Sequence, residues 1–543
     1  MKKPFRIVAA LLGLVLAMGI FAACGGSKNF NTDWDLSDAP VKKITYHDSL
    51  PESPAPVDRK LYDYDDMTQK YTIEIMGSHY GVEPPLDDPI EKYMETKYNI
   101  DLEFTQINGG DFGTTMSTRF ADQDYPDMII LPVGNLDLMQ DFGMMDQLMD
   151  AEIPLSYMPN MCQYVTEEYY DHGTYDGTLW GVPKYQQQCD YNLFIRTDWL
   201  AEFKMEMPKT MDELYQYALK CKEVKGEYFM TSANYGGLFG MMEKLKPNYG
   251  HPGFNVKDGK INHPIIDGTE KKFLTFLNNC MKNGLIHPDW ETMTWESMKS
   301  LMMNDHLGMV DYPASLYVEY WWIGQNKQGT SYKNWAPLPP LDSGFAAPAA
   351  TPAFYFIFPK KMYEEPGKLK RICHMIDQCL YTGDDYFNTI QGGGNDVFGK
   401  EVCYIAPAPE GKTYYKIYED KHPYMNGEKG TSTLSLLAWQ NIGLSDLYHR
   451  TYDPDYPEYS AFYDSKYDEI RSYPRWQNYF KIKLDNTDLA TMSSFMNQEY
   501  VKFAKGTRSL DEWDLFVRDW KTKYKGEKLL NEAADQLGVG HIN

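Results

Sequence analysis

The strongest constraint on the fold is an alternation of strand and helix patterns between residues 71 and 132. The stretches YTIEIMG, IDLEF and DMIIL carry the alternating or continuous apolar residues of strands. Between the first two lies DDPIEKYMETKYN, where Asp88 can cap a helix, Pro89 suits its first turn, and apolar residues recur at helical spacing. A second helix-like stretch precedes DMIIL. This order predicts a largely parallel sheet with helices on its faces.

A block of helices follows, and strands return within and after it. PKTMDELYQYALKCK and SLDEWDLFVRDWKTKY each begin with a capping box, Thr210 with Glu213 and Ser509 with Glu512. EKKFLTFLNNCMKNG is typical of a helix that ends at Gly284. GMVDY and AFYFIF are predicted strands. At ~100–200 residues per domain, the chain is long enough for two to four domains.

The N-terminus has the layout of a secretory signal. Lys2, Lys3 and Arg6 precede an uncharged apolar run that ends in two alanines and Cys24. FAACG resembles the bacterial lipobox, whose cysteine is lipidated and becomes the new N-terminus. We therefore expect a signal peptide over residues 1–23, and a lipidated Cys24 with a linker over residues 24–69. The alternative is an uncleaved anchor helix, and both alternatives place the body outside the cytoplasm, attached to a membrane.

The charge of the chain limits its possible binding partners, and its cysteine content limits the number of disulfides. The chain has 77 acidic and 53 basic residues, a formal charge of −24, which repels nucleic acid. Seven cysteines follow Cys24, with no CxxC motif. We interpret most of them as buried thiols, with at most one or two disulfides.

Catalytic signatures are largely missing from the sequence. It contains no HExxH, HxH or GxSxG motif, so we predict no zinc site, no catalytic serine, no cofactor and no enzymatic activity. GNDVFGK has phosphate-loop spacing, but Glu401 stands where a hydroxyl would bind magnesium. The adjacent Asp384 and Asp385 leave a glycoside hydrolase open as an alternative. The acidic stretch from Asp453 to Glu469 lacks spaced calcium ligands, and whether calcium binds stays open.

Four segments in order resemble one family. These are DYPDMIIL with FGMMDQLMDAEI, LWGVPKY, LFIRTDWL with PKTMDEL, and LMMNDHLGMVDYP. Behind a lipobox, they resemble bacterial extracellular solute-binding protein family 1, the carbohydrate-binding lipoproteins of ABC importers. The resemblance covers about residues 70 to 535.

The resemblance implies an α/β, two-lobed, periplasmic-binding-protein-like fold of type II. Two mixed sheets flanked by helices would be joined by a hinge, and ligand would close the lobes. We place the first lobe at 70–188 plus 346–430 and the second at 189–345 plus 431–543. The chain would cross between them near Gln188 and near Pro340.

The resemblance also implies ligand-binding positions. Polar groups would accept and donate to sugar hydroxyls, and aromatic rings would cover the apolar face of a sugar. The positions are Ser78, His79, Tyr80, Asn135, Lys184, Tyr185, Asp190, Asp311, Tyr312, Trp321, Trp322 and Trp439. Which of Trp321 and Trp322 faces the ligand stays open, and Trp439 could equally be core.

The function implied is a monomeric, lipid-anchored receptor at the extracytoplasmic face of the cell membrane. It would capture a sugar or oligosaccharide and deliver it to ABC transporter permease subunits. The alternatives are a surface glycoside hydrolase, an adhesin or sensor without transport, and a binding protein for peptide or another polar solute.

Overall fold

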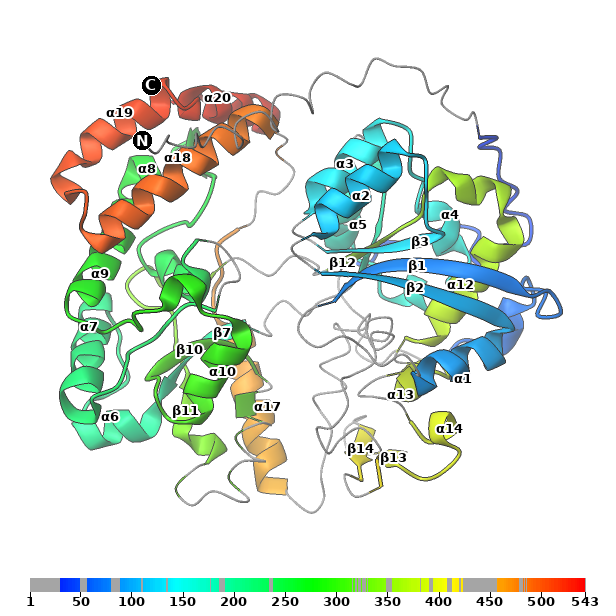
Figure 1. Cartoon of the computed structure of the whole chain (residues 1–543), viewed down its shortest axis with the longest axis horizontal. Helices are drawn as coiled ribbons and strands as arrows, with labels where there is room; N and C mark the ends of the chain where they lie inside the picture. Colours follow the sequence, from blue (N-terminus) through cyan, green and yellow to red (C-terminus); the bar gives the residue numbers. More distant parts are fainter. Residues whose placement is uncertain are drawn as a thin grey trace, which may run out of the picture.

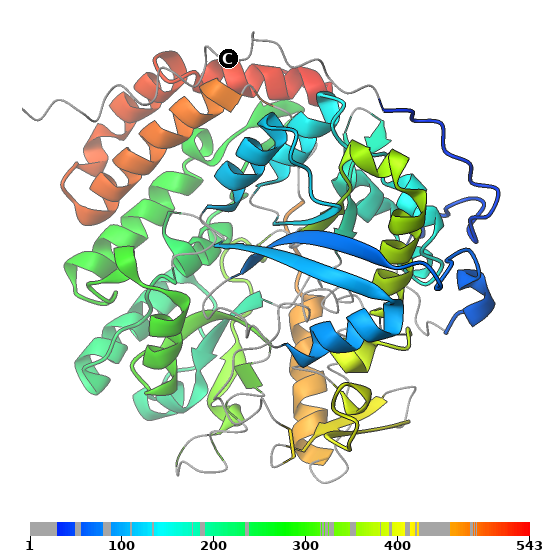
Figure 2. The ribbon, with the colours of Figure 1, turned by 45° about the vertical axis from the view of Figure 1, so that its right-hand side comes forward.

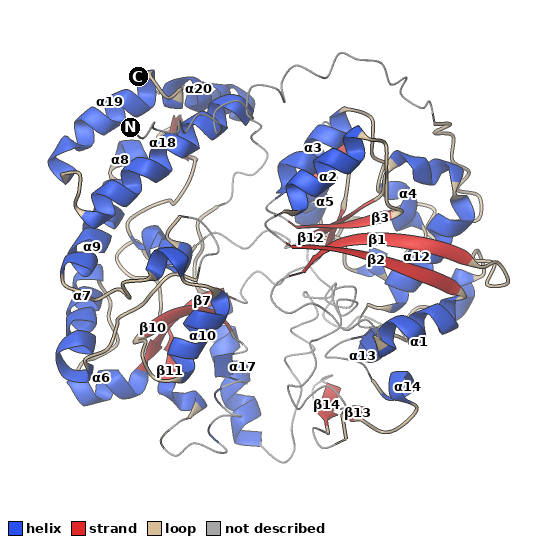
Figure 3. Ribbon diagram, viewed as in Figure 1, coloured by secondary structure: helices blue, strands red, loops and turns tan. Residues whose placement is uncertain are grey.

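The computed structural model places two α/β bodies side by side (Figure 1). It describes residues 30–48, 56–79, 88–108, 111–132, 135–175, 177–184, 191–233, 238–314, 331–347, 354–380, 382–389, 394–407, 413–418, 457–477 and 486–542, with isolated residues in between. Each body has its own sheet, and Figure 3 shows helices around both sheets.

The first body is built on a five-stranded sheet in the order β2-β1-β3-β12-β6. Its strands are β1 (Tyr71–His79), β2 (Ile100–Asn108), β3 (Met128–Pro132), β6 (Val182–Lys184) and β12 (Phe354–Ile357). β1 runs parallel to β2 and β3, whereas β12 runs antiparallel to β3 and β6. The predicted parallel sheet is confirmed, and the strand that returns after the helical block completes it.

Helices cover both faces of this sheet. They include α1 (Pro89–Tyr98), α2 (Phe112–Ala121), α3 (Leu136–Met144), α4 (Glu152–Ser156), α5 (Glu167–Gly173), α12 (Pro366–Gln378), α13 (Tyr386–Thr389) and α14 (Asn395–Phe398). Figure 2 shows α1 and α12 beside the long strands β1 and β2. As predicted, the Asp88 side chain caps α1 and Pro89 occupies its first turn. Asn99 ends α1 in the left-handed conformation.

Alternate residues of each central strand point into two different cores. Met128 and Ile130 of β3 join one cluster of buried apolar side chains, and Ile129 and Leu131 join the other. All five residues of β3 are buried. Burial on both faces explains why the MIIL run is continuously apolar rather than alternating.

The second body has a smaller sheet in the order β10-β7-β11. Its strands β7 (Tyr191–Arg196), β10 (Met309–Pro313) and β11 (Trp335–Pro337) pair antiparallel. Parallel bridges of Tyr228 with Leu307 and of Met230 with Ile286 extend the strand network, so both parallel and antiparallel pairing occur here.

Long helices form the rest of the second body. They are α6 (Thr197–Phe203), α7 (Met211–Lys220), α9 (Thr269–Lys282), α10 (Trp295–Met303), α17 (Pro457–Ser472), α18 (Asn486–Lys505), α19 (Trp513–Thr522) and α20 (Gly526–Leu537). The Thr210 capping box is confirmed, since its hydroxyl accepts from the Glu213 amide at 3.1 Å. Ser509 instead accepts from the Asp511 amide and caps a short 3-10 turn before α19.

The first part of the predicted linker is packed structure. Ala39 is buried in the core of the first body, and the Trp34 indole donates to the Tyr157 hydroxyl at 3.1 Å. Further along, the Tyr62 hydroxyl donates to the Asp377 carboxylate at 2.6 Å. The linker prediction for residues 24–69 is therefore wrong over residues 30–48 and 56–69. We name these two stretches the N-terminal arm.

A buried ion pair fixes the N-terminal arm to α12. Arg371 is fully buried, and its Nε donates to both carboxylate oxygens of Asp65, at 2.7 and 2.9 Å. Its terminal nitrogens donate to backbone carbonyls that include that of Asp66, at 2.7 Å. His374 contacts the same Asp65 carboxylate at 2.9 Å. A fully hydrogen-bonded guanidinium tolerates burial that a lone charge would not.

The described cysteines form no disulfide. All six are free thiols, and five of them are buried. The prediction of buried thiols is confirmed for these residues. Among the helices that the structure describes, none has both the length and the apolar content to cross a bilayer.

Replacing Asp65 should strongly destabilise the first body. Asp65→Ala leaves the Arg371 charge buried without its partner, and we expect the free energy of unfolding to fall by about 3–5 kcal/mol. Chemical denaturation measures this. Asp384→Ala is the control, because the Arg59–Asp384 pair is solvent-exposed (82% and 42%) and should contribute less than about 1 kcal/mol. Equal losses in the two variants would contradict this account of the arm.

Asp377 should make stability depend on pH. Burial raises the pKa of Asp377 to about 7, although hydrogen bonds from Tyr62, Asn160 and Met161 act in the opposite direction. The folded chain therefore holds a proton that the unfolded chain releases near its ordinary pKa of 3.8. Since the folded state binds more protons, this group's contribution to the free energy of unfolding falls as pH rises from about 4 to 7.

Denaturation at several pH values tests this contribution. Wild type should lose stability over that range more steeply than Asp377→Asn, by on the order of 1 kcal/mol per pH unit at most. Parallel pH profiles for the two proteins would show that Asp377 does not carry the effect.

Candidate functional site

A pocket lies where the chain passes between the two bodies. The empty space within it measures about 410 Å³, a figure that includes open solvent at its mouth. The chain passes from the first body to the second between β6 and β7, and it returns between β11 and β12; we call residues 338–353 the return passage. Asn192 and Leu193 belong to β7, directly after the first passage, and a second group of lining residues, from Leu338 onwards, belongs to the return passage. The lining residues are Asn192, Leu193, Lys244, Pro247, Asn248, Leu338, Pro339, Pro340, Phe345, Ala346, Ala347 and Arg475. The pocket therefore adjoins both connections.

One wall is a pairing of two segments far apart in sequence. Ala346 and Arg475 form a parallel β-bridge, in which the Ala346 amide donates to the Pro474 carbonyl at 2.7 Å. The Trp476 ring stacks on Phe345, with 4.5 Å between ring centroids. The Trp476 indole also donates to the Pro247 carbonyl at 3.0 Å. These contacts hold the backbone of Arg475 firmly beside the pocket.

Two asparagines attach the return passage to the second body. The Asn192 amide donates to the Leu193 carbonyl at 2.8 Å and to the Leu338 carbonyl at 3.4 Å. The buried Asn248 accepts from the Leu341 amide at 2.9 Å. The bonds to the Leu338 carbonyl and from the Leu341 amide satisfy backbone groups of a proline-rich stretch, in which prolines offer no amide hydrogens for strand pairing.

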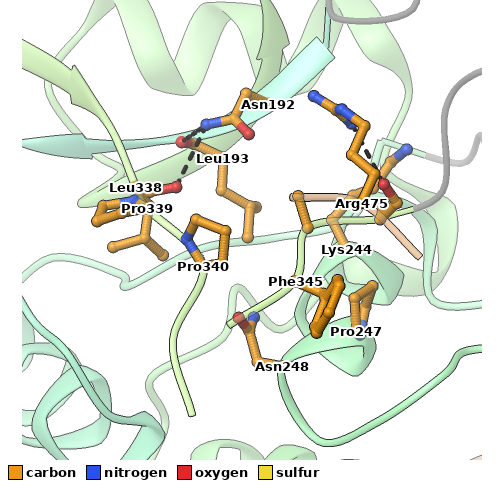
Figure 4. Close-up of a pocket in the computed structure, with 12 residues that line it drawn as sticks. Asn192, Leu193, Lys244, Pro247, Asn248, Leu338, Pro339, Pro340, Phe345 and Arg475 are labelled. Carbon is orange, nitrogen blue, oxygen red and sulfur yellow. Dashed lines mark hydrogen bonds between the residues drawn. The ribbon is translucent and has the colours of Figure 1, made fainter. Parts of the chain in front are cut away.

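Among the residues that the structure describes, Lys244 and Arg475 are the charged side chains that line the pocket, and none of the described lining residues is acidic. Figure 4 shows Lys244 and Arg475 on one side and Leu338, Pro339 and Pro340 on the other. Arg475 Nη1 donates to the Ala347 carbonyl at 3.2 Å. Its Nε and Nη2 are buried and have no hydrogen-bond partner in the described chain.

Nearby carboxylates are engaged elsewhere. Lys246 is almost fully buried between Glu243, at 2.9 Å, and Glu270, at 3.1 Å. Burial raises the pKa of Glu270 to about 7, although Lys246 acts to lower it. Burial alone would lower the pKa of Lys246, but the two carboxylates raise it overall. This closed triad contrasts with the cations of the pocket.

The predicted site residues of the first body lie at one edge of its sheet. Ser78 is near the carboxyl end of β1, is buried, and has no partner for its hydroxyl within the described residues. Asn135 begins α3 just after β3, and Lys184 ends β6 opposite Phe354. For Lys184 and for His79, which ends β1, the structure describes only the backbone. Because β1 and β3 are parallel, their carboxyl ends meet at this edge, which faces the second body in Figure 1.

In the second body, Asp311 and Tyr312 are buried in β10. The Tyr312 ring stacks on Trp295 with 4.8 Å between centroids and 15° between planes. The remaining predicted positions lie outside the described residues: Tyr80, Tyr185, Asp190, Trp321, Trp322, Trp439 and the lipidation site Cys24. The described residues also contain no cluster of three or more His, Cys, Asp or Glu arranged to hold a metal ion.

Sequence reasoning missed Asn192, Lys244 and Arg475. Arg475 occurs in RSYPRWQ, which matches no motif, and it reaches the pocket only through pairing with residue 346. The tyrosine-proline pair before it indicates an extended segment, but not which segment it pairs with.

Comparison with known sequences assigns the chain to a family. The pattern of the bacterial extracellular solute-binding proteins matches residues 80–363, which is more than half of the chain. The chain belongs to this family. The match begins directly after β1 and covers the other four strands of the first sheet and all three strands of the second.

Two curated relatives come from Bacillus subtilis (strain 168). The polygalacturonan/rhamnogalacturonan-binding protein YtcQ is 22% identical over 57% of this chain and 57% of its own length. Lipoprotein LipO is 24% identical over 41% of this chain and 46% of its own length. The chain thus spans about half the length of each of these two relatives.

Solved structures establish the fold. The HMO-binding, ABC-transporter-associated solute-binding protein of Bifidobacterium longum infantis ATCC 15697 superposes with a TM-score of 0.60 at 15% identity. The alignment covers 86% of this chain and 98% of that one. The predicted α/β fold of the type II periplasmic-binding-protein class is confirmed.

Removing Asn248 should loosen the return passage. Asn248→Ala leaves the amide of the buried Leu341 without its acceptor, and we expect the free energy of unfolding to fall by about 1–3 kcal/mol. Asn304→Ala is the control, since Asn304 is exposed and bonds only the end of its own helix, so its effect should stay within about 0.5 kcal/mol. Equal stability of the two variants, measured by thermal and chemical denaturation, would contradict the role given to Asn248.

Proposed function

We propose that the protein captures a sugar or oligosaccharide between its two lobes and passes it to the permease subunits of an ABC transporter. The observation that carries this proposal is the place of the polar residues. The carboxyl edge of the first sheet gathers Ser78, Asn135 and Lys184, and the pocket of the second body adjoins both passages. Family membership and the saccharides named for YtcQ support the same conclusion.

The lobe boundaries are part of the proposal. We assign residues 70–188 plus 346–430 to the first lobe and 189–345 plus 431–543 to the second, with crossings near Gln188 and Pro340. The five strands of the larger sheet fall within the first set and the three strands of the smaller sheet within the second. Two separate passages of the chain between the bodies suit a hinge.

The attachment to the membrane is also proposed. Cys24 would carry lipid after removal of residues 1–23 and would hold a monomeric receptor at the extracytoplasmic face of the cell membrane. The lipobox-like FAACG sequence, the family's extracellular character and the name of LipO support this assignment.

In the bound state, aromatic rings would cover the sugar while polar groups bind its hydroxyls. Tyr80, Tyr185, Asp190, Trp321, Trp322 and Trp439 remain predictions for this role. We infer binding without turnover, because a receptor must release its ligand unchanged.

A thermal-shift screen of the mature chain against a glycan library tests this function. A ligand that binds only the folded state stabilises it by RT ln(1 + [L]/Kd), about 2.7 kcal/mol at a hundredfold excess over Kd. We expect one class of saccharide to raise the melting temperature and to remain intact on overnight incubation. A degraded glycan would indicate a surface glycoside hydrolase instead. A shift with peptides alone would indicate a peptide receptor.

A further inference from the structure

The guanidinium of Arg475 has two donors without a partner, on one edge. A guanidinium always carries its charge and presents its donors in a fixed plane. In Arg475, Nη1 is used by the Ala347 carbonyl, whereas Nε and Nη2 are buried without a partner. Nε and Nη2 lie on the same side of the guanidinium, so their N–H bonds run nearly parallel. That pair matches the two oxygens of a carboxylate.

Buried donors without an acceptor are costly, so an arrangement that keeps them in place calls for an explanation. The Ala346 bridge and the stacking of Trp476 on Phe345 fix the backbone of Arg475, and the bond from Nη1 to the Ala347 carbonyl orients its guanidinium. A donor pair fixed before binding loses little entropy when its acceptor arrives.

The charge of the pocket is opposite to that of the chain. Acidic residues outnumber basic ones by 77 to 53, yet the described part of the lining has Lys244 and Arg475 and neither Asp nor Glu. Lys244 forms no ion pair or hydrogen bond within the described residues. The cation two positions away, Lys246, is enclosed by Glu243 and Glu270. The chain therefore neutralises one neighbouring lysine and leaves the two pocket cations for another partner.

The opposite wall indicates what surrounds the acceptor. Pro339 and Pro340 offer apolar surface across from Arg475, and the Phe345 ring adds apolar surface on the side of Arg475. Such a surface suits the C–H face of a sugar ring, while its polar edge reaches the cations. A carboxylate attached to a sugar ring combines both features in one residue.

We propose that the saccharide captured by this protein is acidic, and that a uronic acid carboxylate binds side-on to Nε and Nη2 of Arg475 with Lys244 as the second cation. This inference rests on the proposed function and narrows its ligand class. It makes Arg475 the residue that distinguishes acidic from neutral sugars.

Titration calorimetry with matched ligands tests the proposal. The probes are uronic acid trisaccharides of galacturonate, glucuronate and mannuronate, each also as its methyl ester, which keeps the ring and removes the charge. The mature chain in detergent should bind at least one acid, and the corresponding ester roughly 10- to 100-fold more weakly.

Substitutions assign the effect to residues. Arg475→Gln should weaken binding of the acid about 10- to 100-fold and leave the ester unchanged, and Arg475→Lys should restore little, because an ammonium lacks the planar pair of donors. Lys244→Gln should weaken the acid about three- to tenfold. Arg518→Gln is the control, since Arg518 is 63% exposed and pairs with Asp519, and it should bind like wild type.

Other outcomes overturn the proposal in distinguishable ways. Tight binding of neutral saccharides, with acid and ester equal, would refute the acidic ligand and leave the sugar receptor standing. Absence of binding to every saccharide would refute both. Displacement of the bound acid by millimolar sulfate, with wild-type affinity for the ester, would show that the cations hold any free anion rather than a sugar acid. If Arg475→Gln does not fold, the wild-type comparison of acid with ester and the Lys244→Gln variant still decide the question.

Discussion

A sheet that is buried on both faces can offer residues to a ligand only at its edges, and this constraint determines where a site can lie in the first body. Alternate residues of β3 enter two separate cores, so neither face of the sheet is available to a ligand. Parallel pairing of β1 with β3 then brings their carboxyl ends together, where Ser78 and Asn135 stand. The second body contributes a pocket where the chain enters and leaves it. The proposed binding between the bodies agrees with what each of them leaves accessible.

Local signals made most of the fold predictable. The DMIIL run, the Asp88 cap and the Thr210 capping box each depend on residues within one turn or one strand, and all three form as expected. The N-terminal arm was misread for the opposite reason. It packs through scattered apolar side chains such as Ala39 and through single polar contacts such as Asp65 with Arg371, 306 residues apart, and neither leaves a period in the sequence.

The site was harder to predict than the fold. Asp311 and Tyr312 could be located on their strand from sequence, and both lie there in the buried part of the second body. Arg475 could not, because its place depends on a bridge to Ala346 that no local pattern encodes. The net charge of −24 describes the whole chain and gives no sign of a pocket whose described lining carries only cationic charges.

If Cys24 is lipidated as proposed, the packed N-terminal arm limits the length of the tether between the membrane and the first body. Trp34 already bonds Tyr157 of the first body. With lipid on Cys24, only ten residues separate the bilayer from that contact, which reach at most ~36 Å when fully extended. The first body would thus stay close to the membrane surface, and hinge motion would move the second body relative to it. A receptor anchored in this way would reach its transporter by lateral diffusion in the membrane, with its first body already near the bilayer surface.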